Sequence, residues 1–395
     1  MKYKKIKLNE LDLITFKGYS IAENKEGSDF VIPSGAVFPS NIKKEKLKKV
    51  ILDGDKNFLE KKDILFNTGG VGTLGRSAFF NITKGRYVPD PFVFVIRNNQ
   101  NNIVPKYLFY GLQTEFSKIQ IKRRTIGTTG ITSIKPRDIL SIELSFPFTD
   151  NDEPDVDEQK RIVKIIEEVE QLKKRREEAN KKMEEITPAL FVKMFGDPAT
   201  NPMGWKKDEL KNVCQNTKLI NLNNLNFDSF KYIDISSIDN RRGVISSPKS
   251  IRLEDAPSRA RQQVKSGDVI ISTVRPNLKN IALVNTEFSE EICSTGFCIL
   301  RPKENIITSE YLYSVAKSKI FTTHLMSLVL GANYPAVKNG DIKGYKIMVP
   351  SVERQKEFTN KMNIIEIERK RQEKLMKDIE ILFNSIVQKA FSGKL

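Results

Sequence analysis

Several residue types that carry catalysis or cross-linking are scarce in this chain of 395 residues, and each scarcity excludes a class of function. There is one histidine, His324, which excludes catalysis by paired histidines and histidine-rich metal sites. The three cysteines, Cys214, Cys293 and Cys298, are an odd number without zinc-ligand spacing. We expect free, mostly buried thiols in a reducing compartment, and no bound metal.

Long apolar runs are also missing. No stretch approaches the roughly 18 apolar residues of a membrane helix. The N-terminal MKYKKIKLNELDLITF is basic but lacks the apolar core and cleavage site of a secretory signal. The sequence therefore predicts a cytoplasmic protein without a membrane partner.

Two short stretches resemble enzymatic motifs, and a third motif is absent. The stretch GGVGTLGRS fits G-x-G-x-x-G and, with Arg76 in place of lysine, a phosphate-binding loop. Both motifs need a helix to follow, whereas SAFFNITKG predicts a strand, so we favour a glycine-rich turn between strands. PDVDEQK holds Asp155, Glu158 and Lys160 in a nuclease-like order, but acidic residues also favour the start of a helix. No Asn/Asp-Pro-Pro-aromatic tetrapeptide suited to base methylation is present. We expect no catalysis and no cofactor.

Positive charge is abundant, and its distribution is informative. The formal net charge is +17. Residues 1–150 hold 25 basic against 15 acidic residues, and residues 198–350 hold 21 against 14, whereas residues 151–197 are slightly acidic. Two basic bodies rather than a basic tail indicate a polyanionic partner.

The chain repeats itself. KMFGDP, which begins at Lys193, recurs as KAFSGKL 196 positions later, and the ungapped match extends back to Glu158 and Arg354. Upstream, KKDILFNT pairs with SGDVIIST. The sequence therefore predicts two copies of one unit, each a globular part followed by a long helix.

Each long helix carries an apolar stripe with a 3–4 spacing and a charged opposite face, which favours pairing with the other helix. Pseudo-twofold symmetry would make this pair antiparallel. Pro188 predicts a kink or a new helical segment. The candidate residues for the helix pair or for a partner are Ile162, Ile165, Val169, Leu172, Met183, Ile186, Leu190, Phe195, Phe358, Ile365, Leu375, Ile379, Leu382, Ile386 and Phe391.

Short β-branched runs such as FVFVIR, DVIISTV and GFCILRP predict that the globular parts are mixed α/β structure rich in strands. Each copy also predicts a helical stretch, PKYLFYGLQTEFSKIQ and SEYLYSVAKSKIFTTHLMSLV, the second capped by Ser309. We expect an α+β fold, with two pseudo-twofold-related mixed α/β globular domains at 1–150 and 198–350 and two antiparallel coiled-coil helices at 151–197 and 351–395.

Basic and amide side chains gather in expected loops. Arginine on guanine and asparagine on adenine are the common base contacts, while most basic side chains only hold phosphates. The candidate DNA-binding residues are Arg76, Lys122, Arg123, Arg124, Arg241, Arg242, Arg259, Arg261, Arg275, Asn277, Lys279 and Asn280.

This architecture resembles the DNA-specificity (S) subunit of type I restriction-modification systems. The resemblance rests on FGDPATNPMGW after the first helix, SGDVIISTVRPNLKNIALV in the second globular part and IVQKAFSGKL at the terminus, in this order. The first globular part matches less well, because it opens without the Gly-Trp entry seen at Gly204 and Trp205.

The resemblance implies that each globular part reads one half of a bipartite, asymmetric site in double-stranded DNA. The helices would set the spacing and dock two methyltransferase (M) subunits, to which restriction/translocase (R) subunits add. Methyl transfer and cleavage, with S-adenosylmethionine and ATP, would belong to those partners, and this chain would be non-catalytic. The alternatives are a recognition subunit of another methyltransferase-based defence system, a coiled-coil scaffold that binds no DNA, and a nucleotide-binding protein.

Overall fold

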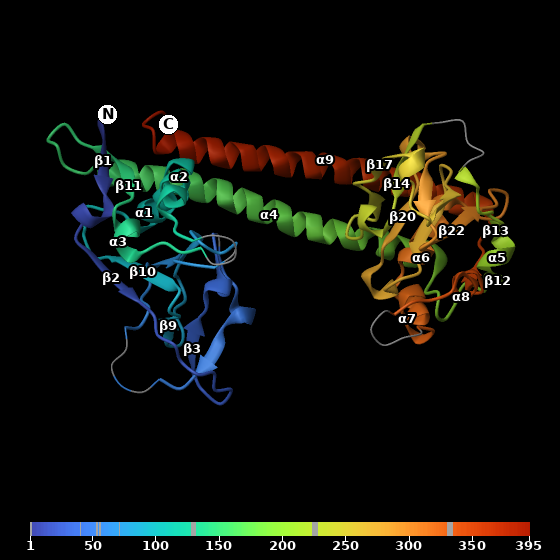
Figure 1. Cartoon of the computed structure of the whole chain (residues 1–395), viewed down its shortest axis with the longest axis horizontal. Helices are drawn as coiled ribbons and strands as arrows, with labels where there is room; N and C mark the ends of the chain where they lie inside the picture. Colours follow the sequence, from blue (N-terminus) through green and yellow to red (C-terminus); the bar gives the residue numbers. More distant parts are fainter. Residues whose placement is uncertain are drawn as a thin grey trace. The chain divides into compact units, whose positions relative to one another are not determined.

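The computed structural model of the chain describes residues 2–39, 41–52, 54, 57–70, 72–127, 132–222, 228–329 and 335–395. They form two compact units. Unit 1 combines Met1–Arg176 with Lys374–Leu395, and unit 2 is Glu177–Glu373. Each unit therefore contains a globular part together with portions of both long helices (Figure 1).

Unit 1 contains four small sheets. A four-stranded antiparallel sheet has the order β2-β10-β7-β8, and a three-stranded sheet has the order β6-β3-β9, with β3 and β9 parallel. The pairs β1-β11 and β4-β5 complete the set. The strands are β1 Lys2–Lys7, β2 Leu13–Lys17, β3 Asp29–Ile32, β4 Val37–Phe38, β5 Asn41–Ile42, β6 Lys48–Val50, β7 Ile64–Asn67, β8 Ser77–Phe79, β9 Tyr87–Pro89, β10 Val93–Asn98 and β11 Glu143–Phe148.

Unit 2 repeats this order of strands and adds one strand, β18, to the smaller sheet. Its sheets are β13-β22-β19-β20, β17-β14-β21-β18, β12-β23 and β15-β16, and the pair β14-β21 is parallel like β3-β9. The strands are β12 Lys207–Glu209, β13 Cys214–Gln215, β14 Ser229–Ile233, β15 Ile238–Asp239, β16 Val244–Ile245, β17 Lys249–Arg252, β18 Ala260–Gln263, β19 Val269–Ser272, β20 Ile281–Leu283, β21 Ile292–Ser294, β22 Phe297–Pro302 and β23 Lys346–Met348.

The inner strands β7 and β19 are buried on both faces. In β7, Ile64 and Phe66 join the core beside the helices, while Leu65 points into a second core beside the smaller sheet. In β19, Ile271 and Ile270 divide between two cores in the same way. A strand alternates its side chains between two faces, so the all-apolar runs ILF and VII predict strands covered on both sides.

The helical stretch expected in each globular part is two helices. These are α1 Pro105–Leu112 and α2 Glu115–Arg124 in unit 1, and α6 Ser309–Lys317 and α7 Lys319–Ser327 in unit 2. Thr114 and Ser318 begin the second helix of each pair by accepting a backbone N–H with their side chains. The expected cap at Ser309 was wrong by one residue, because Thr308 is the capping residue. The shorter helices are α3 Pro136–Leu140, α5 Leu210–Val213 and α8 Asn339–Lys343.

Two long helices follow the globular parts, α4 Val156–Phe195 and α9 Val352–Ala390. The new helical segment expected at Pro188 is wrong, because α4 is one helix with Pro188 inside it, and the alternative of a kink stays a prediction. A proline removes one backbone hydrogen bond, which a helix anchored at both ends tolerates. The helix α4 ends before Gly196, whose φ is +80° and whose N–H donates to Val192 O at 2.8 Å.

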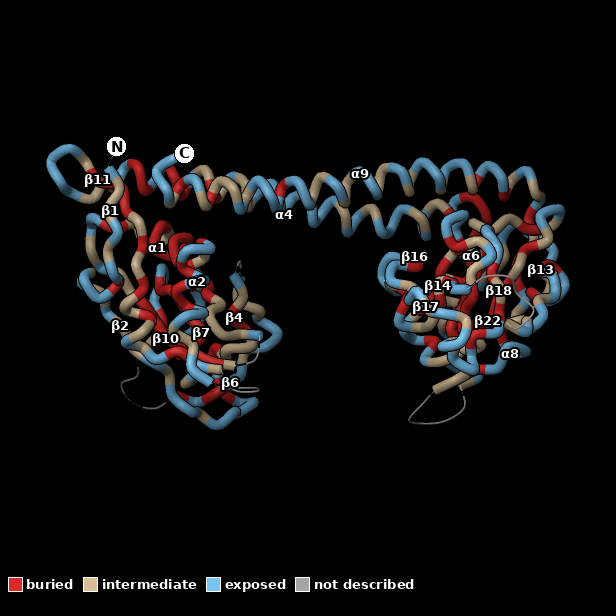
Figure 2. Tube along the Cα trace, turned by 45° about the horizontal axis from the view of Figure 1, so that its top comes forward, coloured by how far each residue is buried: buried red, intermediate tan, exposed pale blue. Residues whose placement is uncertain are grey.

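The two long helices are antiparallel. In unit 1 the start of α4, with Ile162, shares a core with the end of α9, with Val387. In unit 2 the end of α4, with Phe195, shares a core with the start of α9, with Phe358. Because each unit holds the start of one helix and the end of the other, the helices run in opposite directions, and the fold class predicted from the repeat is confirmed (Figure 2).

Candidate nucleic-acid interface

An equivalent turn occurs in both units, and it connects β7 to β8 in unit 1 and β19 to β20 in unit 2. In unit 1, Asn67 N donates to Arg76 O at 2.8 Å, and in unit 2, Ser272 N donates to Asn280 O at 2.9 Å. The glycine-rich stretch and VRPNLKN are therefore structural counterparts. A strand, β8, follows the first turn, so the geometry of a phosphate-binding loop before a helix is excluded. Val71 of that stretch lies outside the described residues.

The turn of unit 1 lies against α2. Gly70, Gly72 and Gly75 have φ values of +102°, +70° and +75°, which glycine adopts without strain. A Cβ on Gly75 would lie 3.3 Å from Ile121 of α2. The turn is therefore next to the end of that helix, where Lys122 is exposed.

Three cations surround one aromatic ring beside this turn. The guanidinium of Arg76 lies 4.8 Å from the ring centroid of Phe38, and the Nζ atoms of Lys43 and Lys46 lie at 4.2 and 5.6 Å. The negative face of an aromatic ring attracts cations, so the ring of Phe38 keeps these three basic side chains close to one another. Arg76 was predicted, whereas Phe38, Lys43 and Lys46 were missed, although the basic run KKEKLKK was a visible signal.

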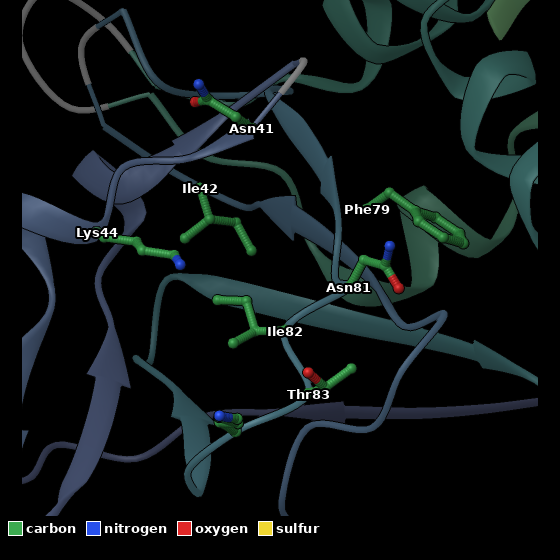
Figure 3. A pocket seen from close by; sticks show the side chains of 8 residues that line it. Asn41, Ile42, Lys44, Phe79, Asn81, Ile82 and Thr83 are labelled. Carbon is green, nitrogen blue, oxygen red and sulfur yellow. The ribbon is translucent and has the colours of Figure 1, made fainter.

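A pocket of about 410 Å³ opens beside this cluster (Figure 3). Ile42 and Lys44 approach it from one side and Ile82 from the other. The lining combines amide, hydroxyl and ammonium groups with apolar side chains, and such groups suit the edges of bases and phosphates. The lining residues are Asn41, Ile42, Lys44, Phe79, Asn81, Ile82, Thr83 and Lys84.

The other candidates of unit 1 differ in exposure. Lys122 and Arg123 are exposed at the end of α2. Arg124 is half-buried and donates to Ser141 Oγ at 2.8 Å and to Gln120 O at 3.1 Å. Arg124 therefore holds α2 to the segment after α3, and we leave it out of the proposed DNA surface. Residues 128–130 of the predicted basic loop lie outside the described residues.

Two residues with a left-handed backbone conformation flank the turn of unit 2. Arg275 and Lys279 have φ values of +50° and +51° and flank the short helix η7, Pro276–Leu278. Arg275 N donates to Pro335 O at 2.7 Å, which ties the turn to the segment after α7. Asn277 is exposed, but Asn280 is 8% exposed, so we also leave Asn280 out.

Arg259 and Arg261 lie near this turn. Both are exposed, at and within β18. Thr295 N donates to Arg259 O, and the adjoining Gly296 O accepts from Thr273 N, each at 2.9 Å. This short loop joins β18 to the turn, so unit 2 also gathers basic residues around one site.

Arg241 and Arg242 have partners within the protein. They lie in the turn of the β15–β16 hairpin, where Arg241 Nη2 is 3.2 Å from Glu184 Oε1 and Arg242 Nη2 is 2.6 Å from Glu373 Oε2. Glu184 belongs to α4 and Glu373 to α9. Both arginines contact the long helices, so DNA would have to compete with two carboxylates for them.

The residues considered for catalysis have structural roles. Asp155 Oδ1 accepts from Glu158 N at 2.9 Å, and Glu158 pairs with Arg161 at 2.6 Å, so PDVDEQK is the start of α4 as expected. No cluster of three metal-ligating side chains occurs among the described residues. His324 packs against Tyr345 with ring centroids 4.8 Å apart.

The cysteines match their prediction. Cys214, Cys293 and Cys298 are buried and free. Burial raises the pKa of the Cys214 and Cys298 thiols to about 12. The thiols are therefore protonated and unreactive at neutral pH.

The predicted helix-pair residues fall into three groups. Ile162, Phe195, Phe358 and Ile379 are buried. Leu172, Ile186 and Leu382 are 42%, 44% and 47% exposed, which leaves them available to a partner protein. The others, Ile165, Val169, Met183, Leu190, Ile365, Leu375, Ile386 and Phe391, are half-buried. Sequence analysis missed the buried Val163, Ile166, Phe191, Met194, Val387 and Ala390.

Comparison with known proteins then identifies the family. A family model described as the type I restriction modification DNA specificity domain matches residues 2–184 and again residues 202–377. The chain belongs to this family. The predicted resemblance is confirmed, and the role of the chain is DNA specificity rather than catalysis.

Two curated members of the type I restriction enzyme family resemble the chain. The MjaVIII specificity subunit of Methanocaldococcus jannaschii is 25% identical over 307 residues, which are 71% of this chain and 69% of that protein. The HindI specificity subunit of Haemophilus influenzae is 21% identical over 149 residues, which are 37% of this chain and 29% of that protein.

Solved structures share the fold of this specificity-family chain. A chain solved in work on complex assembly and conformational transition of the type I R-M system has a TM-score of 0.63 at 17% identity, and the match covers 100% of this chain and 98% of that one. The type I S subunit from M. genitalium has a TM-score of 0.55 at 14% identity, covering 99% and 96%. No helix among the described residues has the length and apolarity needed to cross a membrane.

Proposed function

We propose that the chain is the specificity subunit of a type I restriction-modification complex, in which each unit reads one half of an asymmetric, bipartite DNA site. One observation carries the proposal: the specificity-domain model matches twice, and each match contains its own cluster of basic residues around an equivalent turn. Two readers with different turn sequences, GGVGTLGRS and TVRPNLKN, suit two different half-sites.

The DNA-contacting residues follow from exposure and charge. In unit 1 we assign them to the half-buried Arg76 on the ring of Phe38, to the exposed Lys122 and Arg123 and to the amides and lysines of the pocket, and in unit 2 to the exposed Arg259, Arg261, Arg275 and Asn277. Lys279 is half-buried and its Nζ donates to Lys317 O at 3.3 Å, so we leave it out, as we leave out Arg124. Most of these side chains are expected to hold phosphates, while the amides are the candidates for base contacts. The partners are double-stranded DNA, two methyltransferase subunits and, through them, restriction subunits.

The long helices have two proposed tasks. They would fix the spacing between half-sites, and their exposed apolar positions would dock methyltransferase subunits. Exposed leucine and isoleucine on a charged helix face are typical of a surface that another protein covers. A cytoplasmic location follows from the same role, because the DNA and the partner enzymes are there.

Sequencing of methylated bases in cells that carry this chain and its methyltransferase tests the proposal. We expect an asymmetric site with two short specified parts separated by unspecified bases. Replacing residues 1–150 by another recognition domain should change one part and leave the other. A palindromic methylated site would contradict two independent readers. If the complex methylated no specific site and showed no salt-dependent retention on duplex DNA, a protein scaffold would be favoured.

A further inference from the structure

The hairpin turn Asn240–Gly243 of unit 2 is clamped between its own globular part and the two long helices. On the globular side, Lys317 Nζ donates to Asn240 O at 2.9 Å, and Tyr313 Oη donates to Gly243 O at 3.3 Å. Both side chains come from α6, so the turn rests on a helix of the recognition part.

The close contact between the turn and α6 requires glycine at position 243. Its φ is +68°, and a Cβ there would lie 2.0 Å from Tyr313 Oη and 3.2 Å from Lys317 Nζ. Any side chain would be strained in the left-handed region and would also push the turn off α6. Asn240 Nδ2 donates to Leu278 O at 2.9 Å, which links the turn to the basic turn around η7.

On the helical side, the turn is held by charge. Arg242 reaches Glu373 of α9 at 2.6 Å, and Arg241 reaches Glu184 of α4 at 3.2 Å. Arg369 of α9 donates to Arg242 O at 3.4 Å, while its guanidinium pairs with Glu366 at 2.9 Å. One turn of four residues therefore contacts both long helices.

Both units also have direct contacts between the globular part and a long helix, and in unit 2 Thr359 Oγ1 of α9 donates to Glu310 Oε2 of α6 at 3.0 Å. In unit 1 such contacts come from α1. Lys106 pairs with Glu167, and Tyr110 Oη donates to Glu170 Oε2 at 2.7 Å, so α1 holds α4 directly. The equivalent β4–β5 hairpin is connected by Pro39 and Ser40 alone, two residues in place of Asn-Arg-Arg-Gly. Ser40 lies outside the described residues. The four-residue turn is thus an addition specific to the second reader.

We infer that the turn Asn240–Gly243 is a brace that fixes the orientation of the second recognition part on the helix pair, and that Arg242 is a positioning residue for the spacing between half-sites. The inference rests on the proposed function and reassigns Arg241 and Arg242 from DNA contact to positioning. A reader held at one orientation accepts one spacing, because a one-base-pair change shifts its half-site by about 3.4 Å and rotates it around the DNA axis.

The contacts of the brace affect the orientation of the recognition part more than the folding stability of unit 2. Its ion pairs are partly exposed, with Arg242 and Glu373 side chains 42% and 36% accessible, and such pairs contribute little to folding. A contact of this strength can be lost without unfolding the unit, while the loss still frees the turn to tilt.

A spacer-library experiment tests the inference. The full-length chain is assembled with its methyltransferase subunits, and methylation is measured on DNA in which the two half-sites are separated by the preferred spacer or by one base pair more or less. Arg242→Ala is expected to reduce the preference for the natural spacer about 3- to 10-fold, with the bases of both half-sites unchanged. Glu373→Ala should behave alike.

Charge exchange provides the decisive comparison. Arg242→Glu and Glu373→Arg should each relax the spacing, and the double variant should restore most of the preference because the pair is re-formed with reversed charges. Arg259→Ala is the matched control, since in the described part of the chain this proposed phosphate contact forms no ion pair with the helices. It should weaken binding at all spacers alike and lower the salt dependence of binding.

Three outcomes would overturn the inference. A changed base preference with unchanged spacing in Arg242→Ala would make Arg242 a DNA contact. A double variant no better than the worse single variant would also remove the brace, and so would an Arg242→Ala variant whose spacing preference equals that of the natural chain. Failure of the proposed function gives a different signature, because the natural complex would then show no bipartite site.

Discussion

At the scale of single residues, one buried glutamine in each unit joins the globular part to the start of a long helix. Gln355 is fully buried at the start of α9, where Oε1 accepts from Thr308 N at 2.8 Å and Nε2 donates to Ile306 O at 3.0 Å. Gln159 occupies the equivalent position of α4 and bonds Val104 N and Asn102 O at 2.9 and 3.2 Å. Gln159 and Gln355 lie 196 positions apart, as the repeat does, and each one bonds backbone of the globular part beside it.

We predict that Gln355→Leu lowers the free energy of unfolding of the chain by about 2–4 kcal/mol, because buried backbone groups lose their hydrogen bonds. Gln159→Leu should have a similar effect in unit 1. Chemical denaturation followed by circular dichroism measures both. Gln171→Leu, on an exposed face of α4, is the control and should stay within about 0.5 kcal/mol. Equal effects at Gln355 and Gln171 would refute the assignment.

Lys317 provides a pH-dependent test at the same scale. Burial, together with the charge of Lys279, lowers the pKa of Lys317 to about 8. Unfolded lysine keeps its proton up to a pKa of about 10.4, so the unfolded state binds more protons between these values and stability rises with pH there. At pH 7 the lysine is protonated in both states and the stabilisation is absent.

We predict that the natural chain gains about 1 kcal/mol of stability relative to Lys317→Met between pH 7 and pH 9.5. The comparison is made between the two proteins because the buried thiols, with raised pKa values, lower stability in the same range for both. Denaturant midpoints at four pH values measure the difference. A difference that stays constant with pH would show that Lys317 titrates normally.

At the scale of elements, the aromatic residues at the end of each long helix are anchors of the core. Phe195 lies 4.8 Å from Tyr311 and 5.3 Å from Phe358 between ring centroids. Its counterpart Phe391 lies 4.5 Å from Tyr107 in unit 1. The repeated KMF and KAF motifs therefore end each helix inside a globular part, rather than on a surface for a partner.

We predict that Phe195→Ala destabilises unit 2 by about 3–5 kcal/mol, the usual effect of a large cavity in a core. Val192→Ala, on the same helical turn but 50% exposed, should cost less than about 1 kcal/mol. Urea denaturation of both variants compares them. If Val192→Ala were the more damaging change, the face of α4 assigned to the core would be wrong.

The stripe along the helices was only partly predictable. A 3–4 spacing shows that a helix has an apolar face, but Leu172 and Ile186 are exposed while Ile166 and Phe191 are buried. Apolar residues on a neighbouring stripe obscure which face points inward, and the middle of the pair is held by polar contacts such as Lys173 with Glu380 at 3.7 Å. Which stripe is buried depends on the partner helix, which no local pattern encodes.

At the scale of the whole molecule, both ends of the chain belong to unit 1, whereas unit 2 is the continuous segment Glu177–Glu373. Unit 1 includes the last helical segment, and Tyr3 near the N-terminus would meet a Cβ on Gly393 at 2.7 Å. Each reader therefore depends on both helices. This arrangement makes the facing segments of α4 and α9 the place where length can be changed without cutting into either core.

We predict that removing one helical turn from both helices at facing positions, residues 173–176 and 377–380, shortens the preferred spacer by one or two base pairs. One turn is about 5.4 Å, and base pairs are about 3.4 Å apart. Methylated-site sequencing gives the spacer directly. Removing residues 173–176 alone should disrupt the pairing of the helices and abolish specific methylation. Altered bases at an unchanged spacer would contradict a spacing role.

The sequence by itself determined the repeat, the antiparallel helix pair and the strand-rich globular parts, because these follow from periodicity and from order along the chain. Its motifs also carried the resemblance to the family. It also located the basic turns, since charge and turn residues are local signals. Only the tertiary structure decided which basic residues face solvent, which ones salt-bridge the helices and which are buried. Arg242 and Arg259 look alike in sequence, and they differ because a carboxylate 131 residues away lies beside one of them.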